Sequence, residues 1–79
     1  MHTDLETALR GEIRAEMARQ GVTIGALATA TDRHPQTVSR TLSGDSPLTI
    51  RYAETVAASL GLPLSTLLGR AAAHAGDAA

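Results

Sequence analysis

The segment TIGALATATDRHPQTVSRTLSG, residues 23–44, constrains the fold of this chain more than any other stretch. From Pro35 onward it has the periodicity of a helix with one apolar and one polar side. Val38 and Leu42 fall together on the apolar side, with Thr41 beside them. The polar side comprises Gln36, Ser39, Arg40 and Ser43. A helix in a small domain must bury its apolar side, so the amide, guanidinium and hydroxyl groups face solvent. Since these groups pair with base edges and phosphate oxygens, the segment predicts sequence-specific DNA binding.

Length and composition limit the chain to one small globular domain. Its 79 residues are enough for a single hydrophobic core but not for two. Cysteine is absent, which excludes a disulfide framework and a thiolate zinc site. No apolar run approaches the ~20 residues of a membrane span, and the charged first residues lack the apolar stretch of a signal peptide. We therefore expect a cytoplasmic protein with no membrane partner.

The net charge of the chain is −1, whereas DNA-binding domains are often strongly basic. The positive charge is nevertheless concentrated beside the two-sided helix. Residues 33–51 carry Arg33, Arg40 and Arg51 against Asp45, a net charge of +2, while residues 1–32 and 52–79 carry −2 and −1. Close to a phosphate, this local charge matters more than the total. Tyr52 is the single aromatic residue, which argues against single-stranded DNA or RNA, whose bases stack on several aromatic side chains.

Apolar periodicity and capping residues predict an all-α domain with five helices and no strand. The expected helices span residues 3–20, 24–31, 35–43, 50–60 and 63–70. Pro35 suits the first turn of the third helix, where a missing N–H costs nothing, and Gly44 ends that helix. Glu12 and Glu16 form an acidic strip on the first helix, which we expect to be solvated surface. Residues 1–70 then form the domain, and residues 71–79 are expected to be an Ala-rich flexible tail.

Several short motifs occur in a characteristic order. They are Val22-Thr23, Leu27-Ala28, the run from Pro35 to Arg40, Leu42-Ser43-Gly44 and the run from Leu60 to Leu64. In this order and spacing, the chain from Leu5 to Leu68 resembles the lambda-repressor and Cro family of helix-turn-helix DNA-binding proteins, the XRE type. The resemblance implies a compact five-helix domain of the lambda-repressor type, whose second and third helices form the helix-turn-helix. Since members regulate transcription, it also implies a transcriptional regulator, and we expect a phage or bacterial repressor.

The resemblance implies which residues contact DNA. The third helix would lie in the major groove, with its N-terminal part nearest the bases. Gln36 would pair with an adenine edge and Arg40 with a guanine edge, and Ser39 would assist either. The residues placed for phosphates, at helix N-termini or beside the third helix, are Thr23, Arg33, His34, Thr37, Ser43, Thr49 and Arg51.

The resemblance also implies a homodimer, at least on DNA, because members of the family are usually dimeric. Leu64, Leu67 and Leu68 are expected to cap the core or to form the dimer contact. Two-fold pairing would set two recognition helices about 34 Å apart, one turn of DNA, and would predict a palindromic operator.

Four positions depart from the family pattern. Asp32 stands where the family usually has a glycine in a left-handed conformation, which Asp tolerates better than most residues. Arg33 replaces a usually buried aliphatic residue, so we expect its stem to cover the core and its head to reach solvent or phosphate. Ile24 and Pro35 lack polar groups that many members use on DNA. Specificity must therefore depend heavily on Gln36 and Arg40.

Other functions remain open. An antitoxin that autoregulates its operon could bind a toxin through the acidic first helix or the tail. A protein–protein adaptor could keep this fold without binding DNA, the polar helix side being merely solvated. His2, His34 and His74 are too scattered for a metal site, and the serines and carboxylates form no catalytic set. We therefore expect no enzymatic activity, no metal, no cofactor and no small-molecule substrate.

Overall fold

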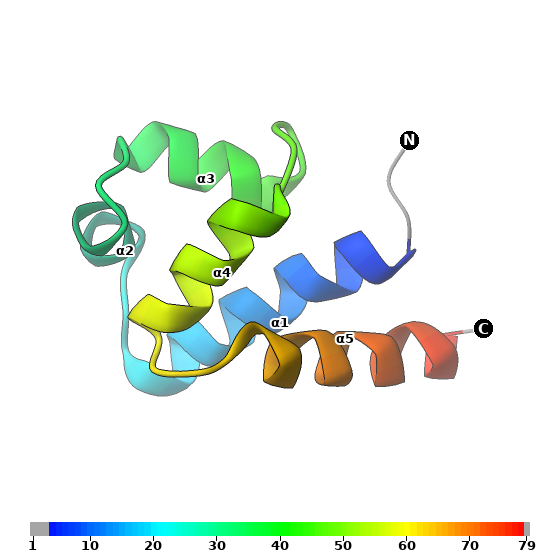
Figure 1. The fold of residues 1–79 in the computed structure, drawn as a ribbon. Coiled ribbons are helices and arrows are strands. Elements are labelled where there is room, and N and C mark those ends of the chain that lie inside the picture. The colour runs from blue at the N-terminus through cyan, green and yellow to red at the C-terminus, as the bar shows by residue number, and fades with distance from the viewer. Residues whose placement is uncertain (1–3, 79) are drawn as a thin grey trace.

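The computed structural model describes residues 4–78 of the chain, with side chains described for residues 5–74. Within that range the chain forms helices and turns and no strand. The helices are α1 (Asp4–Gln20), α2 (Ile24–Ala30), α3 (Pro35–Ser43), α4 (Ile50–Ser59) and α5 (Leu64–Ala78) (Figure 1). The prediction of an all-α domain with five helices is confirmed.

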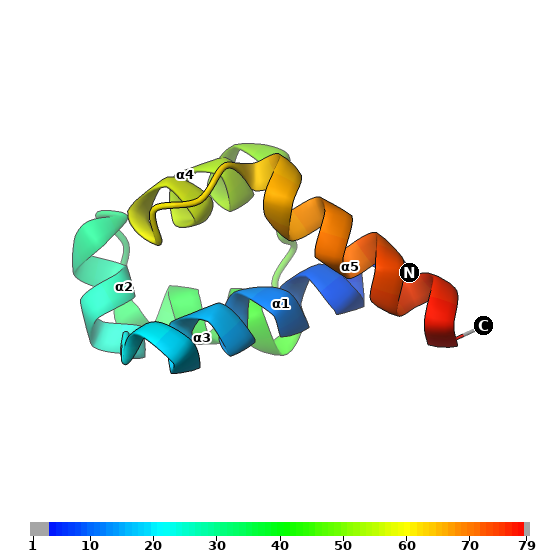
Figure 2. The ribbon, with the colours of Figure 1, turned by 90° about the horizontal axis from the view of Figure 1, so that it is seen from below.

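α4 runs diagonally across the view of Figure 1, and Figure 2 shows it on the side of the molecule opposite α1 and α3. α1 and α5 pack against each other along one edge of the molecule, and α3 lies at the opposite edge (Figure 1). α2 closes one end, while the start of α1 and the end of α5 lie at the other end (Figure 2). This arrangement leaves α3 with one side on the core and one side on the outer surface.

Every helix contributes to one hydrophobic core. Ala28 on α2 and Val38 on α3 are both fully buried, so the two short helices are packed through small and branched side chains. The other buried apolar residues of the described range are Leu9, Ile13, Met17, Leu27, Leu42, Tyr52, Ala53, Val56, Ala57, Leu60, Leu67 and Ala71.

The end of α5 differs from the prediction. The sequence predicts a helix that ends near residue 70, but α5 continues to Ala78, so that boundary is wrong. Ala71 is fully buried and extends the apolar side formed by Leu64, Leu67 and Leu68. Alanine has the highest helix propensity and is small enough to fit between packed helices. Helix prediction from large apolar residues misses Ala71, because its side chain is small even though it is buried.

A left-handed residue shapes the turn between α2 and α3. Asp32 has a φ of 54°, which confirms the conformation expected there. Arg33 donates its backbone N–H to the carbonyl of Ala28 over 2.9 Å, and the N–H of Asp32 donates to Thr29 over 3.3 Å. These two bonds close the C-terminus of α2 in the manner of a Schellman motif. α3 then begins at Pro35, as predicted.

None of the single helices in the described range is long and apolar enough to cross a membrane. α4 and the part of α5 up to His74 satisfy length and composition only as a pair, and the two are bent by 109° relative to each other.

Candidate nucleic-acid interface

α3 has the two sides that its sequence predicts. Val38 and Leu42 are buried in the core, with exposed fractions of 0 % and 2 %. Gln36, Ser39 and Arg40 are exposed, and these three residues are termed the polar face of α3. The expected geometry, an outward amide and guanidinium above a buried apolar side, is therefore confirmed.

The first turn of α3 is fixed by His34. Its Nδ1 accepts a hydrogen bond of 3.1 Å from the backbone N–H of Gln36, so the imidazole caps the helix. A neutral imidazole whose Nδ1 is an acceptor carries its proton on Nε2. Since His34 is exposed, Nε2 is able to donate to a ligand near the helix N-terminus. The positive end of the helix dipole lies there as well and favours an anion.

The arginines near α3 differ from the others in their partners. Arg33, Arg40 and Arg51 are exposed and form no ion pair with any residue that the structure describes. The remaining four are engaged within the protein. Arg10 pairs with Glu6, Arg19 and Arg70 pair with Glu16, and Arg14 binds the carbonyl of Leu42.

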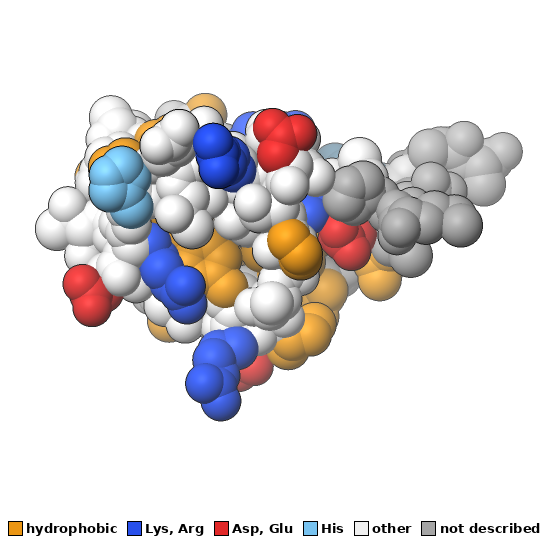
Figure 3. All heavy atoms as spheres, turned by 90° about the horizontal axis from the view of Figure 1, so that it is seen from above, with side chains coloured by type: hydrophobic (Ala, Val, Ile, Leu, Met, Phe, Trp, Pro, Cys, Tyr) orange, Lys and Arg blue, Asp and Glu red, His pale blue; other side chains and the backbone are white. Residues whose placement is uncertain are grey.

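The three arginines without an ion-pair partner in the described range therefore all lie within residues 33–51, the stretch whose net charge is +2. Figure 3 shows the face that carries α3. Arginine and histidine side chains are spread over this face, with hydrophobic side chains visible between them and carboxylates toward its margins. Such a surface attracts a polyanion even though the chain as a whole is slightly acidic.

A hollow of about 230 Å³ lies between α3 and the start of α4. Arg33, Thr37 and Thr49 line it, so the structure brings together three of the residues predicted to contact phosphate. The Arg33 guanidinium lies over the ring of the buried Tyr52, with 5.1 Å from Cζ to the ring centroid. The side chain of Arg33 thus leans on the core while remaining exposed, as expected.

The start of α4 adds two groups to this region. Thr49 caps the helix, its Oγ1 accepting a hydrogen bond of 3.1 Å from the N–H of Tyr52. Arg51 follows in the first turn and is exposed. The hydroxyl of Thr49 and the positive end of a second helix dipole therefore lie beside the hollow, and Arg51 adds an exposed cation to the same turn of α4.

The other predicted phosphate ligands, Thr23, His34, Ser43 and Arg51, do not line the hollow. Thr23 caps α2, its Oγ1 accepting a hydrogen bond of 3.0 Å from Ala26. The hydroxyl of Ser43 donates to the carbonyl of Arg40 over 3.0 Å and lies 3.3 Å from the carboxylate of Asp45. Because that carboxylate repels an anion, the structure argues against Ser43 as a phosphate ligand.

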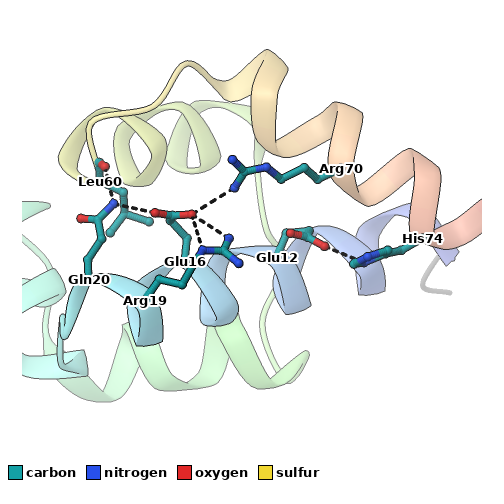
Figure 4. Close-up of polar contacts among 7 residues, drawn as sticks. All are labelled: Glu12, Glu16, Arg19, Gln20, Leu60, Arg70 and His74. Atoms are coloured by element: carbon teal, nitrogen blue, oxygen red, sulfur yellow. Dashed lines mark hydrogen bonds and ion pairs between the residues drawn. The ribbon is translucent and has the colours of Figure 1, made fainter.

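Glu12 and Glu16 are buried, which corrects the expectation of a solvated acidic strip on α1. Glu12 pairs with His74 of α5, and Glu16 accepts a hydrogen bond of 3.0 Å from Arg70 of α5 (Figure 4). Sequence reasoning missed this because the partners of α1 come from the opposite end of the chain.

The carboxylate of Glu16 has further partners within α1. It accepts hydrogen bonds from Gln20 over 2.8 Å and from Arg19 over 2.7 and 3.0 Å (Figure 4). The bonds from Gln20 and Arg19, with that from Arg70, lower the pKa of Glu16 from 4.5 to about 2, against the opposing effect of desolvation. Glu16 therefore fastens α1 to α5 as a carboxylate.

The leucines of α5 divide between core and surface. Leu67 is fully buried, so of its two expected roles it takes that of a core residue, and the alternative of a dimer contact is wrong for this side chain. Leu64 and Leu68 pack against the core and remain partly exposed. Leu5 and Ile50 are more exposed, at 41 % and 62 %, although periodicity places both on apolar helix sides. Leu5, Ile50 and Leu68 line one shallow hollow of about 180 Å³.

In the described part of the chain, no three histidine, aspartate or glutamate side chains are placed to hold a metal ion. Compared with protein-family models, with curated proteins and with solved structures, the chain matches none of them. Its function is therefore inferred from the geometry of α3 and its surroundings.

Proposed function

We propose that this protein binds double-stranded DNA in a sequence-specific manner and regulates transcription as a repressor. In this proposal α2 and α3 form a helix-turn-helix, and α3 lies in the major groove. One observation carries the proposal: the polar face of α3 is exposed while Val38 and Leu42 anchor the helix in the core. A helix held in this way presents its hydrogen-bonding groups to a groove that admits an α-helix.

Base recognition would depend mainly on Gln36 and Arg40. The amide of glutamine matches the N6 and N7 edge of adenine, and the guanidinium of arginine matches the O6 and N7 edge of guanine. Ser39 lies on the same exposed face and is able to bond to either kind of base. Each well-aligned pair contributes about 1–3 kcal/mol of discrimination against the wrong base.

Phosphate contacts would orient α3 in the groove. Arg33, Thr37 and Thr49 line the hollow between α3 and α4, and the exposed Arg51 lies in the first turn of α4. The Nε2 of His34 would add a donor at the start of α3, because Nδ1 is already occupied by the helix cap. These groups fit phosphate oxygens, which give affinity and orientation but little sequence information.

A dimer would be the form that acts on DNA. With Leu67 buried, its contact would use the partly exposed Leu64 and Leu68 of α5. Two copies related by a two-fold axis would recognise a palindromic operator and would double the positive field facing the phosphates.

The antitoxin alternative loses one of its two expected surfaces, because Glu12 and Glu16 are buried against α5 and cannot form an acidic strip for a partner. A protein–protein adaptor without DNA binding is the interpretation that replaces ours if DNA is not recognised.

The decisive experiment is selection from a library of random DNA duplexes with the purified protein. We expect enrichment of a palindromic sequence, followed by binding whose logarithm falls steeply and linearly with the logarithm of the salt concentration. The double variant Q36A/R40A is the matched control, because it removes the two main base contacts and leaves Arg33 and Arg51 in place for phosphates. It should bind duplexes without enriching any of them. Absence of enrichment by the wild-type protein would replace the proposal with the adaptor interpretation.

A further inference from the structure

Two arginines of α1 bind the C-terminal end of α3. Arg10 is buried, with an exposed fraction of 3 %. Its Nε donates to the carbonyl of Thr41 over 2.7 Å, and its Nη2 donates to the carbonyl of Ser46 over 3.0 Å. One turn further along α1, Nη1 of Arg14 donates to the carbonyl of Leu42. All three acceptors are backbone groups of α3 or of the turn that follows it.

These carbonyls are the ones that a helix cannot satisfy by itself. The last four carbonyls of an α-helix lack an intrahelical N–H partner. In α3, the first of them, on Arg40, accepts the backbone N–H groups of Gly44, Asp45 and Ser46. The next two are satisfied by α1 through the arginines described above. Cations at this end also interact favourably with the negative end of the helix dipole.

We infer that Arg10 and Arg14 are positioning residues for the polar face of α3. The inference rests on the proposed function, since it concerns how α3 is presented to DNA. α3 has nine residues, and its buried side chains are Val38, Thr41 and Leu42. So small a buried side fixes α3 on the core but offers little resistance to a tilt of the helix axis. The hydrogen bonds from Arg10 and Arg14 of α1 to the backbone of α3 restrict this tilt, and they do not depend on which side chains α3 exposes.

Gln36, at the N-terminal end of the polar face, lies far from this anchor, so a small tilt at the anchor moves its side chain most. Gln36 is in the first turn of α3, whereas the arginines hold its last turn. A tilt about the C-terminal end therefore displaces Gln36 more than Arg40. Pairing with a base edge requires close alignment of donor and acceptor, so a tilt weakens base discrimination before it weakens contacts to phosphates.

Arg14→Met is the informative variant. It removes the guanidinium that donates to Leu42, keeps a long side chain and leaves the hydrogen bonds of the buried Arg10 intact. Arg14→Lys returns a donor to the same place. Arg19→Met is the matched control, since it makes the same change on the same helix at a side chain that pairs with Glu16 and not with α3. Full-length protein is used throughout.

The first measurement is amide hydrogen exchange in the free protein. Arg14→Met should accelerate exchange roughly tenfold at residues 44–46, whose amides close the end of α3, and less than this in α4. Arg14→Lys should recover part of the protection, and Arg19→Met should leave these amides as in the wild type. Equal acceleration in every helix would mean that Arg14 stabilises the fold in general, and it would overturn the inference.

The second measurement compares binding to the duplex that the wild-type protein selects with binding to its single-base variants. Arg14→Met should lose several-fold of the discrimination while keeping the salt dependence of the wild type, because no phosphate contact is removed. If the wild type enriches a duplex and Arg14→Met discriminates against its single-base variants as well as the wild type does, the positioning role is overturned and the proposed function stands. If the wild type enriches no duplex, the proposed function fails and the positioning role fails with it.

Discussion

The guanidinium of Arg33 lies over the ring of Tyr52, 5.1 Å from the ring centroid, at the edge of the hollow between α3 and α4. The ring also contacts the turn between α2 and α3, since the Tyr52 hydroxyl lies within hydrogen-bond distance, 3.2 Å, of Oγ1 of Thr31. A cation–π contact at an exposed site contributes about 0.5–1 kcal/mol. This is enough to bias the arginine toward the hollow without burying its charge. Arg33 is therefore held beside Thr37 and Thr49 before any ligand arrives.

From this arrangement we expect Arg33→Ala to weaken binding to all duplexes alike. Loss of one phosphate contact should reduce the magnitude of the slope of log K against log salt by about 1. Fluorescence anisotropy at several salt concentrations, with the selected duplex and an unrelated one, measures both effects. Arg19→Ala removes an equal charge from α1 and should keep the wild-type slope. A loss restricted to one base position would assign Arg33 to base recognition instead.

Arg40→Ala should behave differently, because Arg40 belongs to the polar face of α3. We expect a loss of about 1–3 kcal/mol of binding free energy on the selected duplex and relaxed preference at one base pair. Gln36→Ala should relax a different base pair by a similar amount. Repeating the duplex selection with each variant identifies the two positions. If both variants lose affinity evenly over all sequences, neither side chain recognises a base.

Asp32→Gly should stabilise the free protein. The φ of 54° at Asp32 is in the left-handed region, which glycine adopts without the steric cost that a Cβ imposes. The free energy of unfolding should rise by about 0.5–1 kcal/mol, while Asp32→Ala should lower it by about 1 kcal/mol, since alanine lacks the polar side chain that makes the conformation tolerable. Urea denaturation of the three proteins measures the differences. Equal stability of the glycine and alanine variants would show that backbone strain at this turn is unimportant.

The hydrogen-bonded Glu16 should make the free energy of unfolding depend on pH in the acidic range. Bonds from Gln20 and Arg19, with that from Arg70, lower its pKa from 4.5 to about 2, so the folded state favours the ionised form. The resulting stabilisation is fully present above pH 4.5 and is lost as the pH falls from 4.5 toward about 2. Urea denaturation at a series of pH values in this window checks the effect.

Glu16→Gln cannot titrate, so it should be less stable than the wild type at neutral pH and should vary less across the same window. Glu54→Gln, which removes an exposed carboxylate of α4, serves as the control and should retain the wild-type profile. Parallel profiles for wild type and Glu16→Gln would show that Glu16 is not the group responsible.

Local signals were sufficient to predict where most helices begin and end. Thr23 and Thr49 each accept a backbone N–H at the start of a helix, and Pro35 occupies the first turn of α3. Such caps act within three residues of the chain, so they are visible in the sequence. The cap formed by His34 was not predicted. The end of α5 was not predictable in this way, because alanines continue a helix as readily as they form a tail and burial of Ala71 decides the matter.

The candidate site was partly predictable for the same reason. Helical periodicity separates Val38 from Gln36 and Arg40 on α3, and the structure buries the first and exposes the other two. Periodicity did not place the exposed Ile50, because it identifies an apolar side without showing whether another element covers it.

By itself, the sequence determined the order of the helices, most of their boundaries, the left-handed turn at Asp32 and the two sides of α3, all of which depend on neighbours within a few residues. Only the tertiary structure decided which charges remain available. Arg10, Arg14 and Glu16 find partners 28 to 54 residues away in the chain, while Arg33, Arg40 and Arg51 find no ion-pair partner in the described range. The physical reason is that a charged side chain on one helix does not encode which distant backbone or side-chain group will face it. That pairing is set by how the helices pack around their common core.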